Sequence, residues 1–243
     1  VATARFPEGF EARVEAELRG KVALEPGIGA SQDDWARIAE ARRAFLEFYG
    51  EYQLLERGRG FWSSFFDIAR NLVRLAEEKE KPNAERLPGY RESDMQSLER
   101  QLYSEAPIYP ELEKVKLGDS LTFLASSMGA DHPLCRMALS GRPPLDRAAD
   151  LVAGTKLGDV AARKALVEGG RAAIKESTDP MIVLALAVDP YARAARRKYE
   201  DFVQEVERGA YAGISKALFE IRGTSVYPDA TFSLRLSYGQ VKG

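Results

Sequence analysis

Two side chains that could act as a nucleophile and a base lie close together in the segment GADHPLC. His132 is the only histidine of the chain, and Cys135 is the only cysteine. A thiol within hydrogen-bond reach of an imidazole would be an activated nucleophile. This spacing brings the two onto one face only in a helical turn, and the proline at position 133 does not ensure that such a turn includes both residues. A histidine in a loop or at a helix cap is the better interpretation, so we expect no catalytic pair here.

Other catalytic and metal-binding patterns are missing from the sequence. One histidine cannot supply the two Glu-x-x-His motifs of a di-iron bundle, and one cysteine excludes an intrachain disulfide and a multi-cysteine metal site. The sequence has no Gly-x-Ser-x-Gly, no phosphate loop and no dinucleotide-binding glycine pattern. We therefore expect no catalytic, cofactor-binding or metal-binding residue in this chain, and no cofactor.

Three groups of residues have both a functional and a structural interpretation. A basic run could contact phosphate, but it alternates with acidic residues, which favours a solvated helix face with ion pairs; it comprises Arg193, Arg196, Arg197 and Lys198. An aromatic cluster could line a ligand pocket, but its helical spacing favours core packing; it comprises Phe61, Trp62, Phe65 and Phe66. Arg235 could contact substrate, although a cross-strand ion pair is the better interpretation.

The overall composition is typical of a soluble helical protein. The chain has 35 lysine and arginine residues against 37 aspartate and glutamate residues, a formal charge of −2, with 45% hydrophobic residues. This balance favours neither nucleic acid nor an anionic membrane as a partner. The first residues lack the layout of a signal peptide and the sequence begins without methionine, so we expect a piece of a longer polypeptide.

Helical periodicity runs through most of the sequence and predicts an all-α, bundle-like domain over residues 1–222. The pair Asp179–Pro180 predicts a helix start, the apolar run MIVLALAV that follows is expected at the centre of the core, and Gly223 predicts a helix end. The expected helices cover about 7–19, 31–56, 61–81, the residues from Pro82 to Leu102, 112–124, several short segments within 133–177, and a longest helix over 189–222. Along the longest helix the expected inward stripe is Tyr199, Phe202, Val206, Ala210, Ile214, Ala217 and Ile221.

The end of the sequence predicts one β-strand. Between residues 231 and 238 apolar and polar residues alternate strictly, which is typical of a half-buried strand; the apolar face comprises Phe232, Leu234, Leu236 and Tyr238. A lone strand leaves its backbone groups unpaired, and no second strand is evident upstream. We therefore expect residues 223–243 to begin a separate β-domain whose other strands lie outside this chain.

The same terminal segment resembles a known family. FEIRGTSVYPDATFSLRLSYGQVKG, together with GFWSSFFDIARNLVRLAEEKEKPNAERL and DPMIVLALAVDPYARAARRKYEDFV, is similar to bacterial dipeptidyl-peptidases of the seven and eleven types, serine peptidase family forty-six. The resemblance runs from about Gly60 to Gly243. It implies a secreted or periplasmic serine exopeptidase that removes dipeptides from free peptide N-termini.

The resemblance also implies an architecture, namely a chymotrypsin-like double β-barrel with a helical domain inserted into it that caps the cleft. The terminal strand would then belong to the missing barrel. The family's catalytic His, Asp and Ser lie outside the region matched here, so this chain alone is expected to be inactive. A helical-domain asparagine lies near the substrate amine in the family, and neither Asn71 nor Asn83 can be assigned to it.

The alternative is a self-contained helical interaction or scaffold protein without enzymatic activity. As part of a peptidase, the chain would meet peptide substrate through its full-length parent, with no nucleic acid and no membrane partner. A homodimer is also open, including one formed by pairing of strands 231–238. A helical metal or phosphate binder is disfavoured because the sequence lacks ligand clusters.

Overall fold

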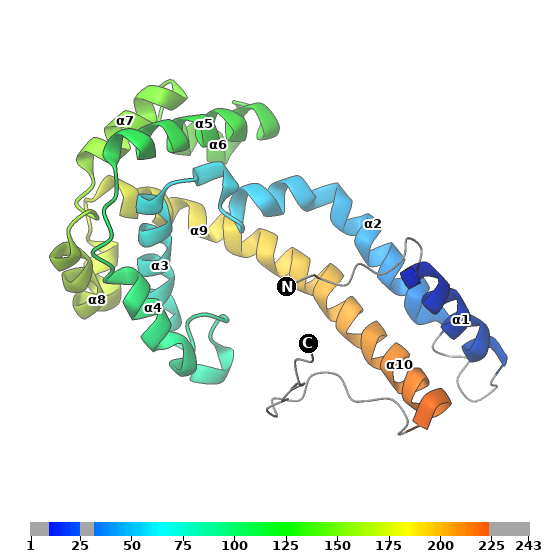
Figure 1. The fold of residues 1–243 in the computed structure, drawn as a ribbon. Coiled ribbons are helices and arrows are strands. Elements are labelled where there is room, and N and C mark those ends of the chain that lie inside the picture. Colours follow the sequence, from blue (N-terminus) through cyan, green and yellow to red (C-terminus); the bar gives the residue numbers. More distant parts are fainter. Residues whose placement is uncertain (1–9, 25–31, 224–243) are drawn as a thin grey trace, which may run out of the picture. The chain divides into compact units, whose positions relative to one another are not determined.

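The computed structural model of the chain describes residues 10–24 and 32–223 (Figure 1). These residues form helices and connecting loops and contain no strand, which confirms the all-α prediction for this part of the chain. The helices are α1 (Phe10–Leu24), α2 (Gln32–Leu55), α3 (Ser64–Glu78), α4 (Met95–Leu102), α5 (Pro110–Met128), α6 (Pro133–Leu139), α7 (Pro144–Gly154), α8 (Val160–Lys175), α9 (Pro180–Tyr199) and α10 (Glu205–Arg222). The predicted strand 231–238 and Arg235 lie outside the described residues.

Two compact units make up the described part of the chain. The larger unit is Ala44–Asp201, and the smaller comprises the described residues up to Arg43 and from Phe202 onward. In the smaller unit α1 packs on α10, and a Cβ atom on Gly213 would lie only 1.9 Å from Asp34 Oδ2. A glycine is required there because the carboxylate of α2 lies against the backbone of α10. The predicted division between residues 222 and 223 stays a prediction.

The core of the larger unit is apolar and is built around α3, α5 and α9. α3 packs against both α8 and α9, and α5 packs against α7 (Figure 1). Most of the run MIVLALAV lies in this core as predicted, since Met181 and Ile182 have no exposed surface and Leu184, Ala185 and Val188 are also buried. Val183 is the exception, at 48% exposure. Burial of such side chains supplies most of the stability of a helical unit.

Several helix ends follow from local sequence, as predicted. The Asp179 side chain accepts hydrogen bonds from the backbone N–H groups of Met181 and Ile182, and Pro180 occupies the first turn of α9. α10 ends at Gly223, whose φ of 57° lies in the region that favours glycine. Between Pro133 and Ser177 the chain forms the expected short helices α6, α7 and α8.

The helix predicted to begin at Phe61 begins three residues later. Ser63 is the N-cap of α3, and its hydroxyl oxygen accepts a hydrogen bond from the backbone N–H of Phe65. Trp62 therefore precedes the helix and is 63% exposed, so the prediction that it packs in the core with the other aromatic residues is wrong. The capping serine therefore determines the first residue of α3, which cannot be determined from the spacing of the aromatic residues alone.

The helix predicted after Pro82 is mostly irregular. Residues Asn83–Glu85 and Glu92–Asp94 form single 3₁₀ turns, and only α4 is α-helical.

In α5 the inward side chains are Leu117, Leu121 and Leu124, whereas Leu112 and Val115 are more than half exposed. Leu112 and Val115, at the start of the helix predicted over 112–124, therefore lie on the outer face of α5.

The predicted longest helix is interrupted. Residues Glu200–Gln204 form a π-helical segment between α9 and α10, so the longest described helix is α2, with 24 residues. A π-turn contains an additional residue and rotates the side chains that follow it. Val203 is therefore fully buried while Phe202 is 59% exposed, and the prediction for Phe202 is wrong.

Candidate functional site

His132 caps a helix and is not paired with the cysteine. Its Nδ1 accepts a hydrogen bond from the backbone N–H of Leu134 at 3.2 Å, at the start of α6. Cys135 is fully buried, and its Sγ contacts the Leu124 carbonyl oxygen at 3.9 Å. Burial raises the pKa of this thiol above its ordinary value, which keeps it protonated and unreactive. The helix-cap interpretation of His132 is confirmed.

The aromatic cluster is core packing except at Trp62. Phe61 and Phe66 stack with ring centroids 4.8 Å apart, and both are buried. Phe65 is also buried, at 4% exposure. These rings fill the interior and leave no aromatic wall for a ligand. The exposed Trp62 ring lies instead beneath the ammonium group of Lys116, 5.7 Å from the ring centroid.

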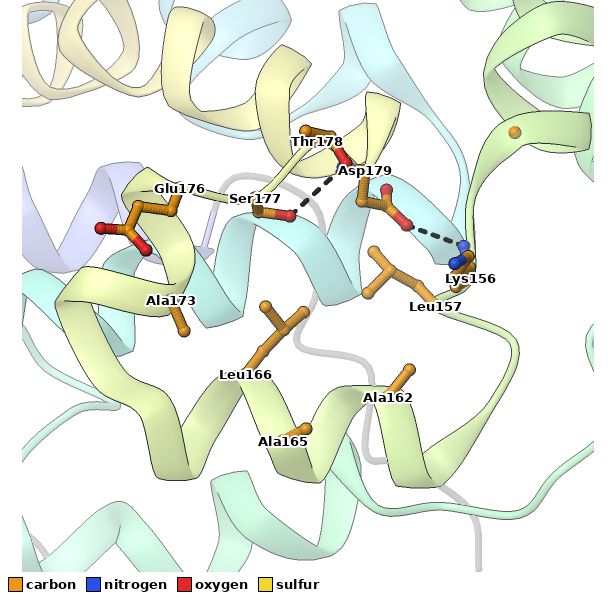
Figure 2. A pocket seen from close by; sticks show the side chains of 11 residues that line it. Lys156, Leu157, Ala162, Ala165, Leu166, Ala173, Glu176, Ser177, Thr178 and Asp179 are labelled. Atoms are coloured by element: carbon orange, nitrogen blue, oxygen red, sulfur yellow. Dashed lines mark hydrogen bonds between the residues drawn. The ribbon is translucent and has the colours of Figure 1, made fainter.

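One cavity of about 480 Å³ lies between α8 and the start of α9 (Figure 2). Its apolar lining comes from Leu157, Ala162, Ala165 and Leu166, and its polar rim from Lys156 and Ser177–Asp179. α8 turns back at Gly170, where φ is 56° and ψ is −144°, and this bend lets the two halves of the helix enclose the hollow. The small alanine side chains leave the space open.

The polar groups at this rim are already engaged. Asp179 Oδ2 accepts a hydrogen bond from the Lys156 backbone N–H at 2.7 Å, and Asp179 Oδ1 accepts one from the Thr155 hydroxyl at 2.9 Å. Figure 2 shows the first of these bonds beside the bond between Ser177 and the Asp179 backbone. Because Asp179 also caps α9, its carboxylate acts as a structural hydrogen-bond acceptor. The cavity is therefore better suited to binding an apolar group than to catalysis.

A second cavity, of about 510 Å³, is more polar and includes Asn71, Asp67 and Arg163 in its lining. The Asn71 Oδ1 accepts a hydrogen bond from the Tyr90 hydroxyl at 2.9 Å. Asn83 lies elsewhere, in an exposed turn, and its Oδ1 accepts from the Glu92 backbone N–H at 2.8 Å. Both amide oxygens therefore stabilise local structure, and the geometry assigns neither residue to a substrate.

Arg163 is the most deeply buried cation of the larger unit. It is 2% exposed, and its guanidinium donates to four backbone carbonyls, those of Leu157, Gly158, Leu102 and Ser104. Burial lowers the pKa of this group. The side chain joins the loop after α4 to the loop before α8 and thereby shapes one wall of the polar cavity.

The residues of the basic run on α9 differ in their surroundings. Arg193 and Arg196 enter an ionic network that links α9 to α3 and to Glu56 at the end of α2, and Lys198 lies over the Phe48 ring, 4.4 Å from its centroid. Arg197 makes no ion pair with any described residue. The prediction of a helix face with ion pairs is confirmed, but the paired part of that face is largely buried.

We define the ionic network as four carboxylates and four cations: Glu56, Glu78, Asp189 and Glu200 with Arg74, Lys81, Arg193 and Arg196. Arg74 lies at its centre. Its Nη2 is 2.6 Å from Glu56 Oε2, and its Nε is 2.7 Å from Asp189 Oδ1. The charges balance, which a buried cluster requires because unpaired charge is costly away from water.

The environment of the network shifts two of its pKa values. Burial alone would lower the pKa of Arg74, but its hydrogen bonds to Glu56 and Asp189 raise it overall. For Glu78 burial acts to raise the pKa, and the bonds from Lys81, the Leu87 backbone and Arg193 lower it overall. Both groups are therefore held in their charged forms at neutral pH. The network is built to hold helices together and offers no group poised for proton transfer.

Within residues 10–24 and 32–223 there is no group of three or more histidine, cysteine, aspartate or glutamate side chains arranged to hold a metal ion. No helix in that part of the chain is long and apolar enough to cross a bilayer.

Comparison with known proteins identifies the family. The sequence matches peptidase S46 over residues 8–243, nearly the whole chain. The chain therefore belongs to the S46 family of serine dipeptidyl-peptidases, which confirms the resemblance seen in the terminal and helical segments. It is similar to the Asp/Glu-specific dipeptidyl-peptidase of Shewanella putrefaciens (strain CN-32 / ATCC BAA-453), with 30% identity over 187 residues. The alignment covers 74% of this chain but only 26% of that relative's length.

Proposed function

We propose that this chain is the helical, substrate-gating part of a bacterial serine dipeptidyl-peptidase that removes dipeptides from free peptide N-termini. The observation that carries the proposal is the family match over residues 8–243 in a chain whose single histidine caps a helix. A serine peptidase needs a histidine that accepts the proton of its nucleophile. His132 instead accepts from a backbone N–H, so the catalytic residues would come from other parts of the parent protein.

The helical architecture supports the gating role. The described residues form two compact helical units, and the larger is held by a buried ionic network that fixes α3 against α9. A gate that admits only free N-termini must keep its shape when peptide binds, because access is controlled by steric fit. The proposed site of action is the periplasm or the medium outside the cell, which fractionation of a producing strain would test.

The test is to assay the 243-residue chain and its full-length parent on dipeptidyl reporter substrates. The parent should release dipeptides from substrates with a free amino terminus and should leave acetylated substrates intact. The isolated chain should release nothing from either. Release of dipeptides by the isolated chain would contradict the proposal, as would a parent that cleaves free and acetylated substrates equally well.

A second candidate is a helical interaction module, and one surface favours it. On the outer face of α5, Leu112, Val115 and Phe123 are 54%, 55% and 57% exposed. Such a face is typical of a contact surface. If it joins two copies of the chain, light scattering should detect a dimer that Phe123→Ser disrupts. A chain that is monomeric with and without this substitution would leave only the role within the parent, where the face would contact the remaining polypeptide.

A further inference from the structure

Exposed apolar side chains cover one side of the larger unit. We call this surface the α5 face, because most of it belongs to α5 and the rest to the loop before α3 and to the start of α7. Each of its six large apolar side chains is more than half exposed: Trp62, Tyr109, Leu112, Val115, Phe123 and Leu145. Those of α5 recur at helical spacing, so they lie on the same side of that helix.

The three elements of the α5 face adjoin one another. Leu145 lies against the backbone of α5, since a Cβ atom on Gly118 would be only 2.5 Å from its Cδ2 atom, and Figure 1 shows α7 beside α5. On the other flank, the backbone N–H of Trp62 donates a hydrogen bond to Ser120 Oγ at 2.9 Å. The apolar side chains therefore form one connected surface.

Trp62 is held in place although its ring is exposed. The ammonium group of Lys116 lies over the ring and is itself bound by the buried Glu113 at 2.8 Å. Tryptophan is enriched among the residues that contribute most to protein interfaces, and a side chain that is already ordered loses little entropy when a partner covers it. The α5 face therefore has a preformed anchor for a partner.

The size of the α5 face matches a protein partner better than a small ligand. Half of a large apolar side chain is about 100 Å² of surface, so the six side chains expose on the order of 600 Å². This is as large as the largest apolar patches of typical monomeric proteins, about 300–600 Å². Together with its polar surroundings, the α5 face approaches the roughly 800 Å² that each partner contributes to a stable interface.

The charges of the α5 face define the partner further. The two lysines in this part of α5 are neutralised within the helix. Lys114 binds Glu111 at 2.6 Å, as Lys116 binds its glutamate partner. Asp119, on the same side of α5, is exposed and makes no ion pair with a described residue. A partner surface that fits is therefore apolar and carries one cation opposite Asp119.

We propose that the α5 face is the surface by which this helical chain docks on the remainder of its parent polypeptide. This inference rests on the proposed function, in which the catalytic residues come from other parts of the parent. The length of the relative supports this occupant, because the alignment covers only 26% of it and nearly three quarters lies outside the aligned part. A covalently linked partner also has a high effective concentration, which favours it over a second copy of the chain.

The test is hydroxyl-radical footprinting with mass spectrometry of the full-length parent and of the 243-residue chain. In the parent, oxidation of Trp62 and Phe123 should fall at least about fivefold relative to the isolated chain, because the core of an interface excludes water. Tyr191, an exposed residue of α9 in the same unit, is the control and should be oxidised equally in both proteins.

A charge placed in the α5 face should break the contact. In the parent, Phe123→Lys should restore oxidation of Trp62 to the level of the isolated chain, because an unpaired charge is costly in a buried interface. Phe219→Lys, at an exposed position of α10 outside the α5 face, is the matched control and should leave Trp62 protected. Both positions are exposed, so both variants should fold, which circular dichroism of the 243-residue chain checks.

Three outcomes would overturn the proposal. The first is equal oxidation of Trp62 in the parent and in the isolated chain. The second is protection of Trp62 in the isolated chain that increases with its concentration, which would make a second copy the occupant. The third is an equal effect of the two lysine variants.

Peptidase activity is measured separately on the same parent, so that the two proposals can fail independently. An active parent in which Trp62 is oxidised as in the isolated chain would contradict the docking and leave the proposed function intact. An inactive parent in which Trp62 is protected would support the docking and contradict the proposed function.

Discussion

The α3–α9 interface and the α5–α7 interface lie in the same unit but join their helices by different means. Between α5 and α7 the contacts are apolar: Leu117 and Leu121 of α5, and Ala148 and Leu151 of α7, have no exposed surface. Between α3 and α9 the core contacts are supplemented by the ionic network, in which Arg74 bonds Asp189. The stability of the α5–α7 interface depends on the fit of apolar side chains. The stability of the α3–α9 interface depends also on each buried charge having a partner of opposite charge.

This difference predicts different sensitivities. Apolar burial changes little with pH and is strengthened by some salts, whereas paired charges lose stability when one partner is neutralised or removed. In the larger unit the charged pairs fix one arrangement of the helices, while the apolar contacts supply the bulk of the stability. Four substitutions or conditions compare the two interfaces, from the largest expected effect to the smallest.

The largest effect should come from removing the central cation of the network. Arg74→Met leaves the buried carboxylates of Glu56 and Asp189 without their main partner, and breaking a buried ion pair costs about 3–5 kcal/mol. Urea unfolding of wild type and variant gives this difference directly. A loss below about 1 kcal/mol, the usual range for exposed ion pairs, would show that the network contributes little.

A comparable substitution at the apolar interface should be slightly milder. Leu121→Ala creates a cavity beside α7, and such changes cost about 2–5 kcal/mol, depending on how far the surroundings collapse. The loss in the free energy of unfolding should be nearly the same at pH 5 and pH 7, because no ionisable group is involved. A strong dependence of that loss on pH would mean that the two interfaces are coupled.

Acid should weaken the ionic interface selectively. The pKa of Glu78 is lowered in the folded state, so its stabilising contribution is present above the unfolded value of about 4.3 and is lost as the pH falls through the folded pKa. Glu78→Gln should therefore flatten the decrease in stability below about pH 5. The measurement is thermal unfolding as a function of pH. If the unfolding temperature fell equally steeply with decreasing pH in Glu78→Gln and in wild type, the stabilising role assigned to the Glu78 carboxylate would be contradicted.

The smallest effect should come from the cap that begins α3. Ser63→Ala removes the acceptor for the Phe65 backbone N–H and a donor to Glu113 Oε2 at 2.9 Å, and loss of an N-cap costs about 1 kcal/mol. Ser126→Ala, at an exposed position of α5, is the control and should be neutral. If the two substitutions had the same effect on unfolding, the cap would not determine the start of α3.

Features set by neighbouring residues were predictable from the sequence. The start of α9 at Asp179–Pro180 and the end of α10 at Gly223 follow from capping preferences, and the apolar run after Pro180 follows from its composition. The exposed positions of Trp62 and Phe202 were not predictable from periodicity. The exposure of Trp62 depends on the cap that starts α3. The exposure of Phe202 depends on the π-helical segment, which rotates the side chains that follow α9.

The ionic network was missed for a related reason. Arg74 and Asp189 are 115 residues apart, and alternating charges along a helix look the same in sequence whether the face is solvated or buried. A possible signal was the segment from Asp189 to Arg196, in which charged residues recur at helical spacing directly after the most apolar run. Family membership, in contrast, was evident from short segments and is confirmed by the match over residues 8–243.

The most direct test of the central claim is labelling with a serine-directed fluorophosphonate followed by mass spectrometry. We predict one stable adduct on the full-length parent, at a serine outside the segment matched by this chain, and loss of dipeptidyl-peptidase activity with it. The isolated 243-residue chain should remain unlabelled under the same conditions. A stoichiometric adduct on a serine within this chain would contradict the account, because it would place the nucleophile in the helical part.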